Sequence, residues 1–255
     1  MFLKSLSLTN FRNYLHLELT FDHRPTIFIG DNGAGKSNIL EAVYLLSTTK
    51  SLRIESEEEL IKNGEEFAKV EGFVEDPTES ELLIILNRIS PEVNFRKKIM
   101  VNGIGRRAID FIGNLPAVIF YPSDINLVTG SPSLRRWHLD LCLAQIDHEY
   151  KKTLTEYEQL VTARNRVLKR IREGFSKIDE LTYWSNELSK KGKVISRKRG
   201  EFFDFINNLD LPLGKFIFEY RSSQISEERL TETIQREIAS AATLIGPHRD
   251  DFVIF

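Results

Sequence analysis

The chain has 255 residues, 41% of them hydrophobic and 28% charged, which is ordinary for a globular protein and enough for one large domain or two lobes. The formal net charge is only −2, and no run of 18 uncharged apolar residues is present, so we expect neither a membrane-spanning helix nor a membrane partner. The N-terminus lacks a secretory signal, and the single cysteine, Cys142, excludes a disulfide framework within the chain, so a cytoplasmic location is expected.

The first expected elements are strands. Residues 2–8 and 16–21 alternate apolar and polar side chains with the period of a half-buried strand, and a polar turn at residues 10–14 connects them. Residues 26–29, Thr-Ile-Phe-Ile, then predict a buried strand.

A phosphate-binding motif follows this strand. Residues 30–37 satisfy the pattern G-x-x-x-x-G-K-[ST], and residues 38–46 predict the amphipathic helix that the motif requires after its loop. In such a loop the glycines let backbone N–H groups approach the phosphates, Lys36 reaches the β- and γ-phosphates, and Ser37 binds Mg²⁺. The alternative is an ordinary glycine-rich turn, which the flanking strand and helix disfavour.

The next part of the chain predicts an antiparallel meander. A polar, acidic segment at residues 49–66 suggests a surface loop with a short helix. Strand-like runs with turn residues between them follow at residues 67–74, 81–88 and 95–101. This order argues against a metabolic P-loop kinase, which would continue with βαβ units. A short helix is expected at residues 106–112 and a buried strand at residues 117–121.

The second half of the chain is mainly helical. From residue 133 the apolar residues recur at intervals of three, four or seven, as on one face of a helix. Helices are expected at residues 133–173, 178–207 and 226–242. Residues 213–220 and 252–255 predict strands.

This helical region is also basic. Residues 131–200 hold 16 Lys and Arg residues against 9 Asp and Glu residues, and such asymmetry can mark a nucleic-acid face. The candidate DNA faces are two runs, Arg164, Arg166, Lys169, Arg170 and Arg172, and Lys190, Lys191, Lys193, Arg197, Lys198 and Arg199. The alternative for each run is a solvated helix face. DNA binding through them would be driven by phosphate contacts, independent of sequence and sensitive to salt.

Four passages together resemble the RecF family of bacterial recombination and DNA-repair ATPases, which is related to chromosome-maintenance ATPase heads. They are residues 3–14, the loop at 30–38, the block P-x-D…G-x-P-x-x-R-R…L-D within 121–140, and Gly-Pro-His-Arg-Asp-Asp at 246–251. The block within 121–140 is far more specific than the loop. One departure is His138, where the family usually has an aromatic hydrophobe.

The resemblance implies an α/β P-loop NTPase fold of the ABC/SMC-head type, with a mixed β-sheet lobe and an inserted helical lobe. Residues 1–130 and 210–255 would form the ATP-binding lobe, and residues 131–209 the helical lobe. The family continues with a signature motif, a Walker B acid and a D-loop, none of which is found here, so the chain resembles the N-terminal two-thirds of the family. We therefore expect weak nucleotide binding and little turnover. The nearest substitute for the Walker B acid, Glu219, is better explained as an outward residue of an ordinary strand.

The resemblance further implies an ATP-dependent DNA-binding protein of recombinational repair and replication-fork maintenance, active in the SOS response to DNA damage. ATP and Mg²⁺ would be its cofactors, with Mg²⁺ on Ser37, and it would form an ATP-dependent homodimer. DNA, single-stranded or at single-strand/double-strand junctions, and the proteins RecR and RecO would be its partners. The implied nucleotide-binding residues are Gly30, Asp31, Asn32, Gly33, Ala34, Gly35, Lys36, Ser37, Asn38 and Arg12. No catalytic residue is assigned, and His248 is given no catalytic role. The alternative function is a non-hydrolysing DNA or protein interaction fragment of such a head.

Several residues keep two interpretations. Arg12 approaches the nucleotide phosphates or is an exposed turn arginine. Asp124 contacts metal or water, as a Q-loop residue does in related heads, or caps a helix, which we favour. Arg135 and Arg136 bind DNA phosphates or pair with Asp140 one turn on, and we expect structural pairing for at least one of them.

Overall fold

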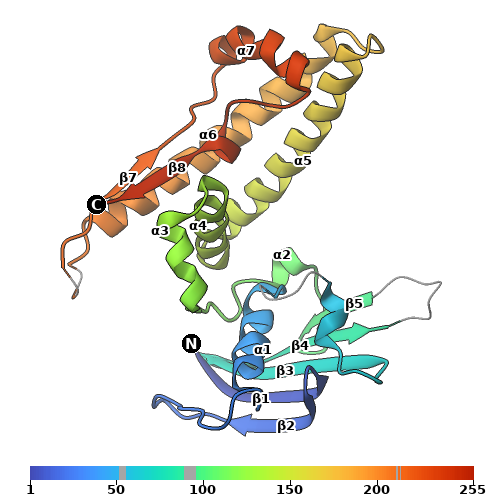
Figure 1. The fold of residues 1–255 in the computed structure, drawn as a ribbon, viewed down its shortest axis with the longest axis vertical. Helices are drawn as coiled ribbons and strands as arrows, with labels where there is room; N and C mark the ends of the chain where they lie inside the picture. Colours follow the sequence, from blue (N-terminus) through green and yellow to red (C-terminus); the bar gives the residue numbers. More distant parts are fainter. Residues whose placement is uncertain (52–55, 89–95, 211, 213) are drawn as a thin grey trace. The chain divides into compact units, whose positions relative to one another are not determined.

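The computed structural model describes residues 1–51, 56–88, 96–210, 212 and 214–255. The chain folds into two compact units, which Figure 1 shows as a ribbon. Unit 1 comprises Met1–Phe120 and Ala144–Ile146, and unit 2 comprises Tyr121–Leu143 and Asp147–Phe255.

Unit 1 is built on an antiparallel sheet. In the described residues this sheet has six strands in the order β2-β1-β3-β4-β5-β6, and every neighbouring pair is antiparallel. The strands are β1 (Phe2–Phe11), β2 (Tyr14–Thr20), β3 (Phe67–Asp76), β4 (Thr78–Asn87), β5 (Arg96–Val101) and β6 (Ile104–Gly105). The predicted meander is thus confirmed, because short turns between successive strands allow only antiparallel pairing.

Helix α1 (Lys36–Thr48) supplies the other half of the unit 1 core. Its apolar face, which includes Ile39, Leu45 and Leu46, joins buried residues of β1, β3 and β4 in one cluster. The helix approaches β3 closely, since a Cβ added to Gly72 would lie 2.8 Å from Leu46 Cδ1. The short elements η1 (Glu57–Leu60) and α2 (Ala108–Phe111) contribute Leu60 and Phe111 to the same cluster.

Two of the buried strands expected in this unit do not form. Residues 26–29 and 117–121 carry no strand pairing in the described chain. Their alternate side chains face solvent, with Ile29 92% exposed and Val118 89% exposed. The physical reason is that a strand needs a hydrogen-bonded neighbour, and none of the described strands pairs with either segment.

Unit 2 is mainly helical. Its helices are η2 (Pro122–Ile125), α3 (Asn126–Thr129), α4 (Pro132–Ile146, whose last turn belongs to unit 1), α5 (His148–Arg172), η3 (Ile178–Glu180), α6 (Leu181–Asn207), α7 (Glu227–Ser240) and η4 (Pro247–Arg249). The first expected helix is therefore split at Asp147, which caps α5 by accepting a hydrogen bond from Tyr150 N at 2.8 Å. In Figure 1, α5 and α6 run side by side as a long hairpin. Among the described residues, no helix combines the length and the apolar character of a membrane span.

Residues 210–255 pack in unit 2, which differs from the expected division into residues 1–130 with 210–255 and residues 131–209. Strands β7 (Phe218–Arg221) and β8 (Asp251–Ile254) pair with each other and lie along α6. The Phe203 ring of α6 lies 5.3 Å from the Tyr220 ring and 5.0 Å from the Phe252 ring. This pair of strands thus covers apolar residues of α6, and the spacing of apolar residues along the chain did not predict that contact.

Candidate phosphate-binding site

The loop at residues 30–37 leads into α1 through glycines in a left-handed conformation. Gly33 has φ 83°, and Gly35, the residue before the helix, has φ 105°. Only glycine adopts such angles without strain. Gly35 is also closely packed, because a Cβ there would lie 2.6 Å from Tyr14 Oη and 2.7 Å from Asn13 Nδ2. Two separate constraints therefore require glycine at position 35.

The loop presents free backbone donors. Within the part of the chain that the structure describes, the N–H groups of Gly33, Gly35, Lys36 and Ser37 donate to no acceptor. The loop residues 31–34 are exposed, and a Cβ added to Gly33 would meet nothing within 4 Å, so the space beside these donors is open. Unpaired N–H groups at a helix N-terminus carry partial positive charge and bind phosphate. The geometry fits a phosphate ligand.

Lys36 lies over this loop. Its Nζ donates to the carbonyl oxygens of Gly30 and Asp31, both at 2.7 Å, so the side chain folds back across the loop. An ammonium group has three donors, and these two bonds leave one for a further acceptor. Ser37 is exposed in the first turn of α1. The structure therefore brings Lys36, Ser37 and the free N–H groups together, as the motif predicts.

The turn between β1 and β2 holds the loop in place. Asn13 Nδ2 donates to the Ala34 carbonyl at 3.2 Å, and Asn38 Nδ2 donates to Asn13 Oδ1 at 2.8 Å. Tyr14 packs on Gly35, and desolvation there raises the pKa of its phenol. Local sequence pattern does not reveal the roles of Asn13 and Tyr14, because their contacts with the loop join residues about twenty positions apart. The only local signal was the polar turn itself.

Arg12 has a structural partner. Its Nε and Nη2 donate to the Glu41 carboxylate at 2.9 and 2.8 Å, and its Nη1 donates to the Glu59 carbonyl at 3.1 Å. The Glu41 side chain is only 1% exposed, and this two-pronged pairing satisfies its buried charge. Arg12 is therefore not an exposed turn arginine, and its approach to nucleotide phosphates stays a prediction. Glu41 was missed, although an acid on the apolar face of a predicted helix was a usable signal.

Asp124 stabilises a helix start, as we favoured, but it does so from the third position of η2, and Tyr121, not Asp124, is the N-cap residue. Its carboxylate accepts a hydrogen bond from Tyr121 N at 2.7 Å, at the start of η2. This bond satisfies a backbone donor at a helix start, so it provides a structural reason for an acid at this position.

Arg135 and Arg136 both bind the segment at 246–251. Arg135 donates to both carboxylate oxygens of Asp251, at 2.8 and 3.0 Å, and this bonding lowers the pKa of Asp251. Arg136 Nη1 donates to the Asp250 carbonyl at 2.7 Å. The prediction that at least one of these arginines pairs within the protein is thus confirmed. The prediction that the partner is Asp140 is wrong, because the partners are the Asp251 carboxylate and the Asp250 carbonyl. The two family-like passages at 121–140 and 246–251 are bonded to each other.

Arg199 is the centre of a buried ionic network. Its side chain is 1% exposed and donates to Asp140 at 2.6 Å, to Asp250 at 2.7 Å and to Tyr150 Oη at 2.9 Å. The Tyr220 hydroxyl also donates to Asp250, and burial with this contact raises the pKa of Tyr220 to about 12. The network ties α4, α5, α6 and β7 together.

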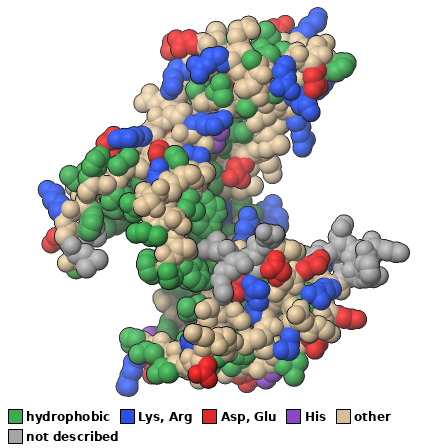
Figure 2. Space-filling model, in the orientation of Figure 1, with side chains coloured by type: hydrophobic (Ala, Val, Ile, Leu, Met, Phe, Trp, Pro, Cys, Tyr) green, Lys and Arg blue, Asp and Glu red, His purple; other side chains and the backbone are tan. Residues whose placement is uncertain are grey.

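The basic runs are less available than the sequence suggests. Arg164 is fully buried and donates to Glu237 at 2.6 Å, and Arg199 is buried as described above, so both leave the candidate DNA faces. The other run members that pair with carboxylates are Lys169, Arg170, Lys190, Lys191, Arg197 and Lys198. On the face drawn in Figure 2, Lys and Arg side chains are spread over the helices of unit 2 with acidic side chains among them. The alternative of a solvated helix face therefore accounts for part of both runs.

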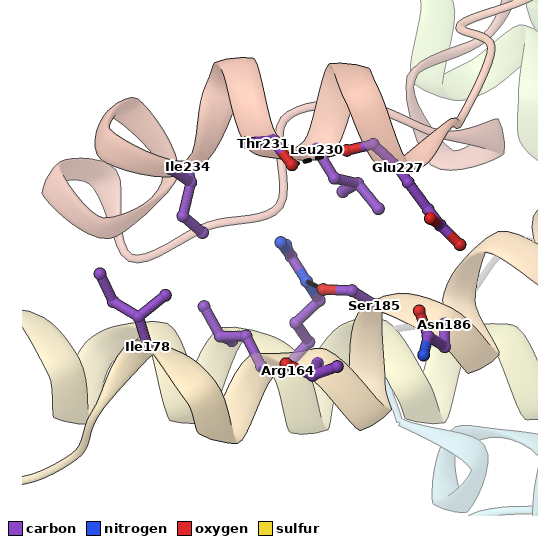
Figure 3. A pocket seen from close by; sticks show the side chains of 10 residues that line it. Arg164, Ile178, Ser185, Asn186, Glu227, Leu230, Thr231 and Ile234 are labelled. Carbon is purple, nitrogen blue, oxygen red and sulfur yellow. Dashed lines mark hydrogen bonds between the residues drawn. The ribbon is translucent and has the colours of Figure 1, made fainter.

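A cavity of about 280 Å³ lies between the helices of unit 2 (Figure 3). Ile178 on one side faces Leu230 and Ile234 of α7 on the other, and the Arg164 side chain projects between them. All residues that line it belong to unit 2, so it is not part of the phosphate-binding loop. Among the described residues, no cluster of three His, Cys, Asp or Glu side chains is placed to hold a metal ion.

Comparison with known proteins identifies close relatives. The family model described as the RecF/RecN/SMC N terminal domain matches residues 2–110. The DNA replication and repair protein RecF of Bacillus mycoides (strain KBAB4) is 35% identical over 282 aligned positions, which cover 100% of this chain and 73% of that protein. The protein of the same name from Agathobacter rectalis is also 35% identical, with 99% of this chain and 72% of that protein covered.

Solved structures agree with these relatives. The structure of the recombination mediator protein RecF-ATPrS in the RecFOR pathway superposes with a TM-score of 0.89 at 31% identity, covering 100% of this chain and 73% of that one. The structure of RecF-ATP gives a TM-score of 0.88, also at 31% identity, covering 99% and 72% of the two chains. The similarity therefore includes both units.

Proposed function

The chain belongs to the RecF family, and we propose that it is an ATP-dependent DNA-binding protein of recombinational repair and replication-fork maintenance. Its fold is the α/β type of the ABC/SMC ATPase heads, and its role in DNA replication and repair is that of its relatives. The observation that carries the proposal is the set of free N–H groups beside Lys36, in a chain of which 99% superposes on RecF with ATP.

The proposed nucleotide site is the loop with its supports. The free N–H groups of Gly33, Gly35, Lys36 and Ser37, together with the Lys36 ammonium, would hold the phosphates of ATP. Ser37 Oγ would bind Mg²⁺, which neutralises phosphate charge when it is bound. Asn13 and Asn38 would keep the loop in its open form through their mutual hydrogen bond. The full set proposed is residues 30–38 with Arg12.

The second candidate is a non-hydrolysing DNA or protein interaction fragment of such a head. The observation in its favour is the position of Glu219, the acid that follows a short apolar run. Its carboxylate is half exposed and pairs with Arg221 at 2.8 Å, as in an ordinary strand. Measuring ATP hydrolysis with and without duplex DNA separates the two candidates, because the second predicts no turnover under either condition.

We extend the proposal to the partners that the family resemblance implies. DNA would bind single-stranded and at single-strand/double-strand junctions, without sequence preference. RecR and RecO would be protein partners, and ATP would promote a homodimer in the cytoplasm, as part of the SOS response. Crosslinking of the chain with and without ATP tests the dimer, and co-purification with RecR and RecO tests the partners.

Lys36→Ala tests the nucleotide site directly. The change removes the cation that folds over the loop while the backbone donors stay, so we expect ATP binding to fall below detection. Isothermal titration calorimetry with ATP and Mg²⁺ measures it. Lys98→Ala, which removes an exposed lysine from β5 of the same unit, is the control and should bind as the wild type does. Equal ATP affinity in the Lys36 variant and the control would show that the loop is not the site.

A further inference from the structure

The end of the α5–α6 hairpin exposes aromatic side chains. We call residues 166–183 the hairpin tip; it contains the last turns of α5, the connecting loop, η3 and the first turn of α6. Phe175 is 74% exposed and Tyr183 is 65% exposed. Large apolar side chains at a loop between helices cost free energy when they face water. Both rings lie at one end of the hairpin and are accessible to a partner.

The loop that carries Phe175 is held rigidly. Phe175 N donates to the Arg170 carbonyl at 2.8 Å and Gly174 N to the Ile171 carbonyl at 3.0 Å, while Gly174 has φ 81°. These two bonds form a Schellman motif, in which the glycine closes the helix and the next residue projects from it. Arg170 Nη2 also donates to the Phe175 carbonyl at 3.4 Å. The phenyl ring is therefore presented on a fixed backbone.

The second ring and the next turn are fixed as well. Tyr183 packs edge-on against Trp184, with ring centroids 5.3 Å apart, and Trp184 packs on the buried cluster around Leu181. In the loop, Glu180 accepts hydrogen bonds from Ser176 Oγ at 2.9 Å and from Lys177 N at 3.4 Å. Both exposed rings thus stand on ordered backbone and lose little conformational freedom on binding.

The hairpin tip is also rich in basic side chains. The tip holds five Lys and Arg residues against three acids, and all five basic side chains are exposed. Lys169 and Arg170 lie 4.0 Å from their acidic partners, at the limit of an ion pair. Arg166, Arg172 and Lys177 have no carboxylate partner among the described residues. The surface therefore combines available cations with flat apolar rings.

We propose that the hairpin tip is a binding surface for single-stranded DNA. Bases would stack on Phe175 and Tyr183, and phosphates would lie against Arg166, Arg172 and Lys177. Unpaired bases have free faces, whereas duplex bases are stacked on one another, so exposed rings favour a single strand. The proposal rests on the DNA binding proposed above and places it at one site.

The test is the affinity of the whole chain for a fluorescent 20-nucleotide oligo-dT, measured by anisotropy at low salt. The double variant F175A/Y183A should bind about tenfold or more weakly, since each base that stacks on an aromatic ring adds to the affinity. Phe205→Ala is the matched control. Its ring is 62% exposed on the same helix as Tyr183, about 33 Å away at 1.5 Å per residue, and its loss should leave the affinity unchanged.

A second arm examines the charges. Arg166→Gln with Arg172→Gln should reduce the dependence of oligo-dT affinity on salt, and Trp184 fluorescence should change when oligo-dT binds to the wild type. Thermal melting of each variant should match the wild type, because all of these side chains are exposed.

The outcomes separate this proposal from the proposed function. If the wild type binds DNA and F175A/Y183A binds it equally well, the hairpin tip is not the binding surface, although the proposed DNA binding still holds. If F175A/Y183A loses affinity for duplex and for single-stranded DNA by the same factor, base stacking on the two rings does not explain the binding. If the wild type binds no DNA of either kind, the proposed function fails together with the tip.

Discussion

At the scale of single residues, Gly35 shows why the loop sequence is so restricted. Its left-handed backbone excludes side chains by strain, and Tyr14 and Asn13 exclude them by contact. We predict that Gly35→Ala lowers the free energy of unfolding by about 3 kcal/mol, since both terms apply together. Urea denaturation monitored by circular dichroism measures the change.

Gly33→Ala is the control for that substitution. Gly33 also has a left-handed backbone, yet nothing lies within 4 Å of an added Cβ, so only the strain of about 1–2 kcal/mol remains. Equal losses for the two variants would mean that Tyr14 and Asn13 do not pack on the loop.

His248 gives unit 2 a pH dependence. Its Nδ1 faces Tyr157 Oη at 2.8 Å and its Nε2 faces the Thr243 carbonyl at 3.0 Å. Burial lowers the pKa of His248, and the charges of Arg249 and Arg136 act in the same direction. The folded chain therefore binds fewer protons than the unfolded chain once the pH is below the unfolded value of about 6.5.

This difference in proton binding makes the folded chain less stable as the pH falls. The stability that neutral His248 contributes is present above about pH 6.5 and is lost as the pH falls through its lowered folded pKa. Burial lowers the pKa of His138 too, so both residues act together. We predict that the melting temperature falls between pH 7.5 and pH 5 and falls less in the variant with His138→Gln and His248→Gln. An equal pH dependence in the variant and the wild type would contradict this assignment.

At the scale of elements, the ionic network around Arg199 joins α4, α5, α6 and β7. Removing a buried ion-pair partner leaves its carboxylates unpaired, so Arg199→Ala should destabilise the chain by about 3–5 kcal/mol. Arg197→Ala is the matched control, because Arg197 lies only two residues from Arg199 in the sequence but its pair with Glu201 is exposed. We expect Arg197→Ala to lower the free energy of unfolding by less than about 1 kcal/mol. Chemical denaturation measures the free energy of unfolding of both variants. Similar decreases in the two would show that the buried network does not stabilise unit 2 more than an exposed ion pair does.

The segments at 26–29 and 117–121 show that an apolar run alone does not predict a buried strand. Both runs have strand-like composition, and both are extended with solvent-facing side chains such as Ile27 and Phe120. Composition reports a preference for a pleated, half-buried surface, while pairing depends on a neighbouring strand. Exposed apolar runs of this kind favour association between molecules.

At the scale of the whole molecule, DNA binding should be governed by phosphate contacts. The net charge of −2 does not attract DNA by itself, so the affinity must come from local cations. We predict that the logarithm of the affinity falls linearly with the logarithm of salt concentration, with a slope of about −0.7 per phosphate contacted on a single strand. Anisotropy titrations between low and moderate salt measure the slope, and an affinity independent of salt would exclude this mode.

The sequence by itself determined what depends on local pattern. The loop motif at 30–37, the antiparallel order of β3, β4 and β5, and the helices α5, α6 and α7 follow from periodicity, glycines and capping residues within a few positions. The family was also evident, because four short passages in fixed order carry it. These signals are short-range, so they survive without the fold.

Only the tertiary structure decided which distant residues meet. In the fold, Asn13 and Tyr14 contact the loop, and Arg12 pairs with Glu41. Asp140 pairs with Arg199 and not with Arg136, and residues 210–255 pack in unit 2. The tertiary structure also withdrew Arg164 and Arg199 from the basic faces by burying them. A charge or ring in the sequence has no partner until the chain folds, since the free energy of each contact depends on burial and on neighbours far along the chain.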